Sequence, residues 1–126
     1  MSGELILIVD DNDKNLKLVR DILQYHGFRT LEATTGRQGI DLARETDPDV
    51  VLLDIQLPDI DGVRALQELR ASAMAAATPV VALTAFAMKS DRQRFLDEGF
   101  SGYIAKPIDV RTFPLLVREF CEARGQ

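Results

Sequence analysis

The chain has 126 residues, of which 46% are apolar and 28% are charged, and its formal net charge is −5 at pH 7. These proportions are typical of one globular domain. The negative charge argues against binding to nucleic acid or to an anionic membrane, because both favour a basic surface. We find no apolar run long enough to span a membrane, no signal-peptide pattern and only one cysteine, Cys121. We therefore expect a cytoplasmic protein without an intramolecular disulfide.

Five short apolar segments have the length and composition of strands. Two of them, residues 5–9 and 50–53, are continuously apolar, which is typical of strands covered on both faces of a parallel sheet. Helical spacing follows each segment, and alternating strands and helices indicate an α/β fold with helices on both faces. We expect one doubly wound domain over residues 1–126. The predicted strands are residues 5–9, 28–33, 50–53, 79–83 and 102–105.

Capping and breaking residues set the expected limits of the helices. Thr34 and Thr35 offer an N-cap for the second helix, and Gly27 and Gly99 are suited to end the first and the fourth. The fourth helix, expected over residues 91–98, is weakly amphipathic. The apolar positions expected to anchor the first four helices are Leu16, Val19, Ile22 and Leu23, then Ile40, Leu42 and Ala43, then Val63, Ala65, Leu66 and Leu69, then Phe95 and Leu96.

Pro114 lies within the last predicted helix, where a proline removes a backbone hydrogen bond. Either the regular helix begins near Thr112, so that Pro114 lies in its first turn, or the helix is distorted. Residues 71–78 are expected to contain a helix end and a connector. The expected apolar face of the last helix consists of Val110, Phe113, Leu116, Val117 and Phe120.

Candidate site residues follow four of the five predicted strands. Asp10 and Asp11 follow the first strand and Asp54 the third, whereas Thr84 follows the fourth strand and Lys106 the fifth. In a parallel sheet the carboxyl ends of the strands meet at one edge, and ligands bind there near a switch in strand order. If the strand order is 2-1-3-4-5, three carboxylates, a hydroxyl and an ammonium share this edge.

Such a cluster of acids predicts a metal ion. Three ionised carboxylates about 5 Å apart repel one another by about 3 kcal/mol per pair at an effective dielectric constant of 20. A divalent cation removes this repulsion, and oxygen ligands without histidine or cysteine favour Mg²⁺. A carboxylate can also form an aspartyl phosphate. With Lys106 as a fixed positive charge and Thr84 as a donor, the group predicts phosphoryl transfer to Asp54.

Five motifs stand out together: Asp10-Asp11-Asn12, residues 53–58 (LDIQLP), Asp61-Gly62, residues 81–85 (VALTA) and residues 103–107 (YIAKP). As a set they resemble the response-regulator receiver domains, and the resemblance extends over the whole chain. It implies a flavodoxin-like sheet of order 2-1-3-4-5 and a phosphoryl group donated by a histidine kinase or a histidine phosphotransfer protein. Residues 15–18 and 79–91 further resemble a single-domain regulator of cell-cycle phosphorelays.

The resemblance also implies a role for each acidic residue. Asp54 would be the phosphoacceptor. Asp11, Asp54 and the backbone carbonyl of Gln56 would bind Mg²⁺ directly, and Asp10 would act mainly through water.

The remaining roles concern the phosphoryl oxygens. Thr84, the Ala85 N–H and Lys106 would hold them, and the Lys106–Pro107 peptide bond would be cis. Tyr103 would be an aromatic switch that rotates inward when Thr84 moves; the alternative is a half-exposed strand tyrosine without this role.

Because no residues remain for an output domain, we expect the output to be a phosphorylation-dependent contact with a downstream target protein. The expected output surface includes Phe86, Met88 and Phe95, together with the fifth strand and the last helix. We expect a monomer or a weak dimer that binds no nucleic acid and turns over no substrate. The alternative is a receiver domain excised from a larger hybrid kinase or regulator.

Two other classes remain to be compared. Phosphohydrolases that form an aspartyl-phosphate intermediate are built on a similar sheet. They would carry a second Asp, as general acid and base, where this chain has Gln56. A flavodoxin-like module would need a phosphate-binding loop of Ser, Thr and Gly where residues 10–13 read DDND. The sequence contains no P-loop, no GxGxxG motif and no zinc spacing. His26, next to a helix stop, is expected to be a surface residue without a role in phosphotransfer.

Overall fold

The computed structural model describes residues 3–71, 78–85 and 89–124, and five strands and five helices lie within these ranges. In chain order they are β1 (Leu5–Val9), α1 (Asp13–Tyr25), β2 (Arg29–Ala33), α2 (Gly36–Thr46), β3 (Val50–Asp54), α3 (Gly62–Ala71), β4 (Val80–Thr84), α4 (Lys89–Glu98), β5 (Gly102–Ala105) and α5 (Phe113–Arg124).

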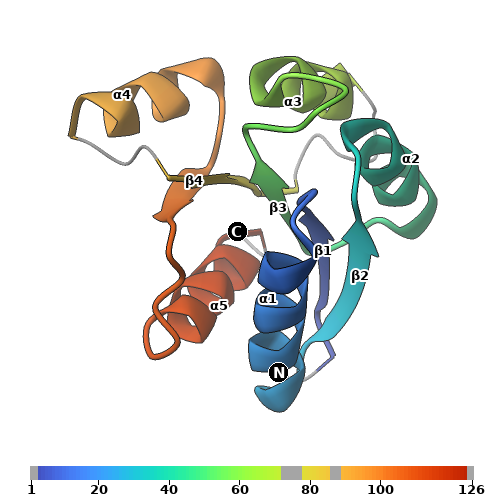
Figure 1. Ribbon diagram of the computed structural model, residues 1–126, viewed down its shortest axis with the longest axis vertical. Helices are drawn as coiled ribbons and strands as arrows, with labels where there is room; N and C mark the ends of the chain where they lie inside the picture. The colour runs from blue at the N-terminus through green and yellow to red at the C-terminus, as the bar shows by residue number, and fades with distance from the viewer. Residues whose placement is uncertain (1–2, 72–77, 86–88, 125–126) are drawn as a thin grey trace.

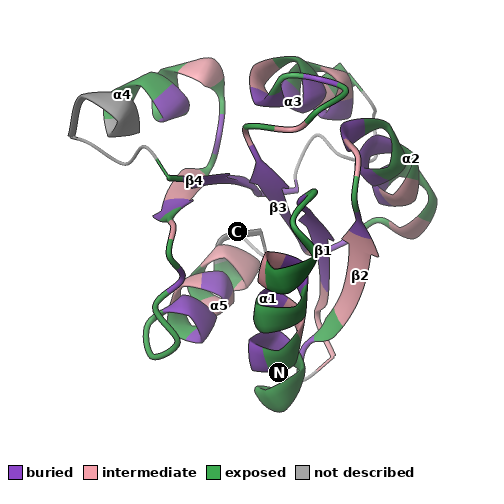
Figure 2. Cartoon of the chain, in the orientation of Figure 1, coloured by how far each residue is buried: buried purple, intermediate pink, exposed green. Residues whose placement is uncertain are grey.

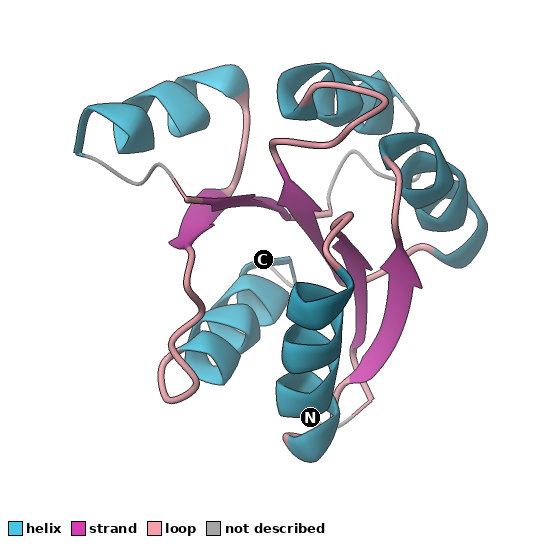
Figure 3. Ribbon diagram, in the orientation of Figure 1, coloured by secondary structure: helices cyan, strands magenta, loops and turns pink. Residues whose placement is uncertain are grey.

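The strands form one parallel sheet in the order β2-β1-β3-β4-β5, as the sequence predicts. Figure 1 shows α1 and α5 on one face of this sheet and α2, α3 and α4 on the other, and the same three layers are visible in Figure 3. No helix in the described ranges is long and apolar enough to cross a lipid bilayer.

The three central strands are buried on both faces, which explains their continuously apolar sequences. In β1, Ile6 and Ile8 belong to the core cluster covered by α1 and α5, whereas Leu7 and Val9 belong to the cluster covered by α2, α3 and α4. β3 and β4 alternate in the same way, because successive side chains of a strand point to opposite faces. Figure 2 shows these buried strands between the two layers of helices.

Capping residues set the helix limits, and those of α2 and the ends of α1 and α4 are among the predicted ones. The Asn12 side chain caps α1 by accepting a hydrogen bond from the backbone N–H three residues later, at 3.0 Å. Thr35 caps α2 in the same way, at 3.1 Å. Gly27 and Gly99 follow α1 and α4 with φ angles of 90° and 107°, which glycine adopts without strain. His26, at the end of α1, is exposed, as expected.

Some element limits differ slightly from the predictions. β2 begins at Arg29 and α4 at Lys89, and β3 continues through Asp54. Ala71 ends α3, whereas residues 72–77, where a connector is predicted, lie outside the described ranges.

Two predicted apolar anchors are wrong. Val110 is 57% exposed and lies in the turn before α5, so it does not belong to the apolar face of that helix. Leu96 is 40% exposed because Phe95, its neighbour on α4, is the residue that turns toward the sheet.

Of the two alternatives for the last helix, the first is confirmed. α5 begins at Phe113, so Pro114 lies in its first turn, where a missing N–H removes no helical hydrogen bond.

The burial of the central sheet leads to a prediction about stability. Leu52 in β3 is fully buried, so Leu52→Ala is expected to lower the free energy of unfolding by about 2–5 kcal/mol through lost apolar contact and a residual cavity. Leu115 on α5 is 66% exposed, and Leu115→Ala is expected to change the free energy of unfolding by less than about 0.5 kcal/mol. Urea denaturation followed by circular dichroism measures both. Equal losses in the two variants would contradict the assigned burial.

Candidate functional site

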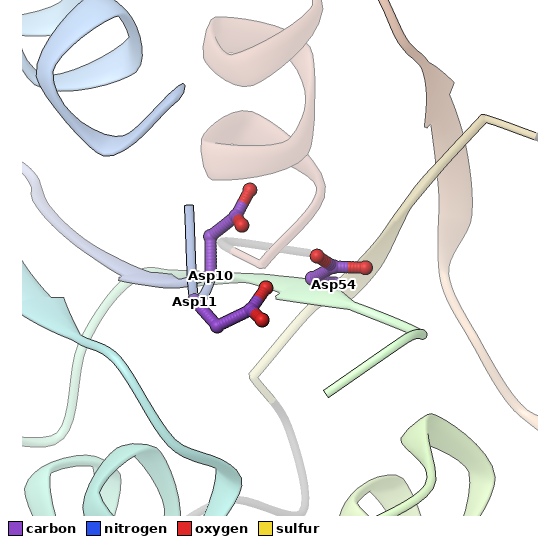
Figure 4. Close-up of side chains that lie close together, drawn as sticks. All are labelled: Asp10, Asp11 and Asp54. Carbon is purple, nitrogen blue, oxygen red and sulfur yellow. The ribbon is translucent and has the colours of Figure 1, made fainter. Parts of the chain in front are cut away.

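Three acidic side chains lie together at the carboxyl ends of β1 and β3, which are neighbours in the sheet. Asp10 and Asp11 directly follow β1, and Asp54 is the last residue of β3. One carboxylate oxygen from each residue lies within 4.8 Å of the other two. Figure 4 shows the three side chains at this edge of the sheet, with the Asp11 carboxylate directed toward Asp54. The predicted convergence of these residues is therefore confirmed.

The Lys106 ammonium joins two of these acids. Its Nζ lies 3.1 Å from Asp10 Oδ2 and 3.1 Å from Asp54 Oδ2. Lys106 follows β5, and its backbone N–H donates to the carbonyl of Thr84 at 2.8 Å, which fixes the start of the loop at the same edge. The Lys106–Pro107 peptide bond is cis, as expected. Because the lysine side chain is only 22% exposed, salt screens these ion pairs less than it screens surface pairs.

Further hydrogen bonds fix both buried carboxylates. Asp10 Oδ1 accepts from the Asn12 N–H at 2.9 Å, and its Oδ2 accepts from the side-chain amide of Asn15. Asp54 Oδ1 accepts from the Gln56 N–H at 2.8 Å, whereas its Oδ2 contacts the lysine. Asp10 is thus positioned by the beginning of α1, and Asp54 by the loop after β3.

Burial raises the pKa of Asp54 above its ordinary value. The Gln56 N–H and the Lys106 ammonium oppose this increase because they favour the ionised form, and the Asp10 charge adds to it. Burial would lower the pKa of Lys106, but its contacts with Asp10 and Asp54 outweigh this effect and raise the pKa. The lysine is therefore protonated at neutral pH. Keeping Asp54 ionised costs free energy, and a nearby cation would reduce this cost.

The chemistry of the donor set fits a hard divalent cation. The cluster of Asp10, Asp11 and Asp54 offers only carboxylate oxygens, and within the described ranges it contains no histidine or cysteine. Three carboxylates and one ammonium leave a net negative charge, which a divalent cation would balance. Mg²⁺ typically takes one or two carboxylates, several waters and a substrate phosphate, so these residues suit Mg²⁺.

Other predicted site residues lie on β4 and in the neighbouring loops. Thr84 is buried at the end of β4, in register with Ala105 of β5, and Ala85 follows it as an exposed residue. Gln56 is exposed and forms an isolated β-bridge with Asp61. The structure places these residues at the same edge of the sheet, and their contacts with a phosphoryl group or a metal stay predictions.

The two described aromatic residues at the predicted output surface, Tyr103 and Phe95, differ in burial. Tyr103 on β5 is half-buried, and its ring centre lies 6.0 Å from that of Phe95 on α4. Phe95 is only 2% exposed and also contacts Phe100, so the prediction that it anchors α4 is confirmed, whereas its place in the predicted output surface is wrong. α4 is poor in apolar residues, and Phe95 is the one that anchors it in the core. Phe86 and Met88 lie outside the described residues.

Two positioning side chains escaped the sequence analysis. Asn15 contacts Asp10 from the first turn of α1, and a polar residue so soon after the first acidic cluster is a signal that could have suggested it. Asp59 accepts hydrogen bonds from the backbone N–H groups of Gly36 and Arg37. Gly36 and Arg37 lie 23 and 22 positions earlier in the chain, so no local pattern predicts the contact.

Comparison with known proteins agrees with this geometry. Residues 6–118 match the family model of the response regulator receiver domain. The polar-differentiation response regulator DivK of Brucella ovis is 40% identical over 115 residues, which are 91% of this chain and 94% of that protein.

Solved structures resemble the chain over nearly its whole length. A CheY-like receiver domain protein from Methanospirillum hungatei has a TM-score of 0.87 at 26% identity, and the match covers 98% of each chain. The receiver domain of the sensor histidine kinase PA1611 from Pseudomonas aeruginosa has a TM-score of 0.84 at 33% identity, over 99% of this chain and 100% of that chain. That structure contains a magnesium ion coordinated in its active site cleft. The family match, the relatives and the acidic cluster agree, and the chain belongs to the response-regulator receiver family of two-component phosphorelay signalling.

Proposed function

We propose that this protein is a phospho-switch in which Asp54 accepts a phosphoryl group from a histidine kinase or a histidine phosphotransfer protein. The observation that carries the proposal is the 3.1 Å contact between Asp54 and Lys106, next to two further acids whose oxygens lie within 4.8 Å. For a carboxylate with a purely structural role, this arrangement would be unfavourable in free energy, because burial and like charges both oppose its ionisation. It suits a carboxylate that receives an anionic group with the help of a cation.

The donor set suggests how the metal would be held. Bound Mg²⁺ would neutralise negative charge on the carboxylates and on the transferred phosphoryl group. Asp11, Asp54 and the Gln56 carbonyl would be direct ligands, with Asp10 acting through water. Asp11 is exposed, whereas Asp10 is buried and both of its oxygens already have protein partners. This difference supports the division between a direct and a water-mediated ligand.

In the transfer, Asp54 Oδ2 acts as the nucleophile. Its bond to phosphorus forms as the bond between phosphorus and the imidazole nitrogen of the donor breaks, and the neutral imidazole leaves with the electron pair of that bond. The Gln56 N–H retains Oδ1 throughout. Lys106 then moves its contact from the carboxylate to a phosphoryl oxygen, and Thr84 and the Ala85 N–H donate to the others.

The energies involved are sufficient for a switch. Phosphorylation adds roughly −1.5 to −2 charges and three acceptor oxygens. A charge-assisted hydrogen bond contributes about 1.5–3 kcal/mol, and about 5.5 kcal/mol moves a two-state equilibrium from 1:99 to 99:1. Two or three such bonds, formed only in the active state, provide this difference. A shift of Thr84 toward the phosphoryl group would let Tyr103 move, which would change its contact with Phe95 on α4.

The proposed output is the binding of a downstream target protein to the surface of α4, β5 and α5, without turnover of a substrate. A stand-alone regulator is favoured by the match to DivK, which covers 94% of that protein. The same likeness favours a role in the signalling of polar differentiation and the cell cycle. The alternative, a receiver domain from a hybrid kinase or a larger regulator, would keep the same site. A monomeric or weakly dimeric state and a cytoplasmic location stay predictions.

The phosphoacceptor is tested by intact-protein mass spectrometry. Incubation with a small-molecule phosphodonor and Mg²⁺ is expected to add the mass of one phosphoryl group to the wild-type protein. Asp54→Asn should gain none, because its amide is not a nucleophile. Asp61→Asn, which changes a carboxylate of the loop that follows β3, is the matched control and should behave like the wild type. A mass gain that persists in Asp54→Asn would show that the phosphoryl group lies elsewhere.

The crowding of acids predicts opposite effects with and without metal. In metal-free buffer, Asp11→Asn is expected to raise the free energy of unfolding by about 1 kcal/mol, because one of three neighbouring negative charges is removed. At 100 times its dissociation constant, Mg²⁺ should stabilise the wild type by about 2.7 kcal/mol, and Asp11→Asn by much less. Urea denaturation with and without Mg²⁺ measures both effects, and Asp41→Asn on α2 controls for net charge. Equal stabilisation of Asp11→Asn and the wild type by Mg²⁺ would exclude Asp11 as a ligand.

A further inference from the structure

The N-terminus of α2 is held by a residue of the loop between β3 and α3. The Asp59 carboxylate accepts from the Gly36 N–H at 2.8 Å and from the Arg37 N–H at 3.0 Å. These are the first two residues of α2, and the Thr35 side chain accepts from the third N–H. The first N–H groups of a helix have no partners within it, so two of these three depend on Asp59, which lies 23 and 22 positions further along the chain.

The same loop packs directly against this helix end. Ile60 is buried, and a Cβ atom built on Gly36 would lie 2.0 Å from its Cγ2. The missing side chain at Gly36 therefore allows the loop to approach α2 this closely. The Arg37 side chain in turn binds Glu68 on α3 through two contacts of 2.6 and 2.9 Å. The helix end that receives Asp59 is thus itself held against α3.

Gln56, whose carbonyl is proposed as a metal ligand, lies near the start of this loop. The Gln56 N–H donates to Asp54 Oδ1, and an isolated β-bridge joins Gln56 to Asp61. The loop is therefore attached to the phosphoacceptor at one end and to α2 in its middle, through Asp59. The Gln56 carbonyl therefore lies between these two attachments along the chain.

We propose that Asp59 is a positioning residue for the phosphoryl-transfer site, which fastens the loop between β3 and α3 to α2 and so holds the Gln56 carbonyl in place for Mg²⁺. The inference rests on the proposed function, since it requires this carbonyl to be a ligand. A carboxylate suits the attachment because a helix N-terminus carries a partial positive charge. Burial opposes ionisation of Asp59, but hydrogen bonds from the Gly36, Arg37 and Asp59 N–H groups, together with the Arg37 charge, outweigh burial and lower its pKa.

Two control variants separate positioning from simpler effects. Thr35→Ala removes the other cap of the same helix and leaves the attachment of the loop intact, so it reproduces a loss of helix capping alone. Asp41→Asn removes a negative charge from the exposed side of α2 and reproduces the change in charge. Neither control variant releases the loop.

The experiment is a calorimetric titration of the metal-free proteins with Mg²⁺. Asp59→Ala is expected to weaken Mg²⁺ binding by about 3–10-fold, less than the roughly 10–100-fold typical of partners that contact a ligand directly. Asp59→Asn keeps one acceptor oxygen and should be intermediate. Gly36→Ala, whose new methyl group displaces Ile60, should also weaken binding. Thr35→Ala and Asp41→Asn are expected to bind Mg²⁺ like the wild type.

A second measurement needs no metal. In metal-free protein the amide NMR signal of Gln56 should shift in Asp59→Ala and stay in place in Thr35→Ala. Unchanged Mg²⁺ affinity in Asp59→Ala, or an equal loss in Thr35→Ala, would overturn the inference. A wild-type protein that binds no Mg²⁺ and gains no mass at Asp54 would instead overturn the proposed function, and the Gln56 signal would still report whether Asp59 holds the loop.

Discussion

The Lys106 ammonium, 3.1 Å from both Asp10 and Asp54, allows two carboxylates to lie side by side in a largely buried place. Without this cation, burial and mutual repulsion would favour protonation of one of them. The three residues come from the ends of β1, β3 and β5, so the contact requires a strand order that brings these ends within reach of one lysine side chain. The topology of the sheet and the ionisation of the site therefore depend on each other.

Several elements contact this cluster from different directions. The first turn of α1 holds Asp10 through two asparagines, and the loop after β3 holds Asp54 and is itself attached to α2. The end of β4 accepts a hydrogen bond from the backbone of Lys106. A change of charge at Asp54 would therefore alter contacts that lead to helices on both faces of the sheet. This arrangement suits a domain whose surface responds to a chemical event at one edge.

Much of this arrangement could be predicted from the sequence, because continuous apolar segments identify buried parallel strands and parallel strands share one edge. The convergence of Asp10, Asp54 and Lys106 follows from that rule together with the strand order 2-1-3-4-5, which the family resemblance implies. The choice between Phe95 and Leu96 does not, since both are apolar neighbours on a polar helix, and packing decides that Phe95 faces the sheet while Leu96 stays 40% exposed. The attachment of Asp59 to α2 is likewise invisible in the sequence, because its partners are backbone N–H groups of a distant element and carry no signature of residue type.

The two oxygens of Asp54 are chemically inequivalent in this fold. One is already engaged by the backbone N–H of Gln56, whereas the other contacts an amine that can change partners. In an acyl phosphate, the engaged oxygen would become the carbonyl and the other would bridge carbon and phosphorus. Under the proposed transfer, the mixed anhydride would then form at one oxygen only, the one beside the lysine.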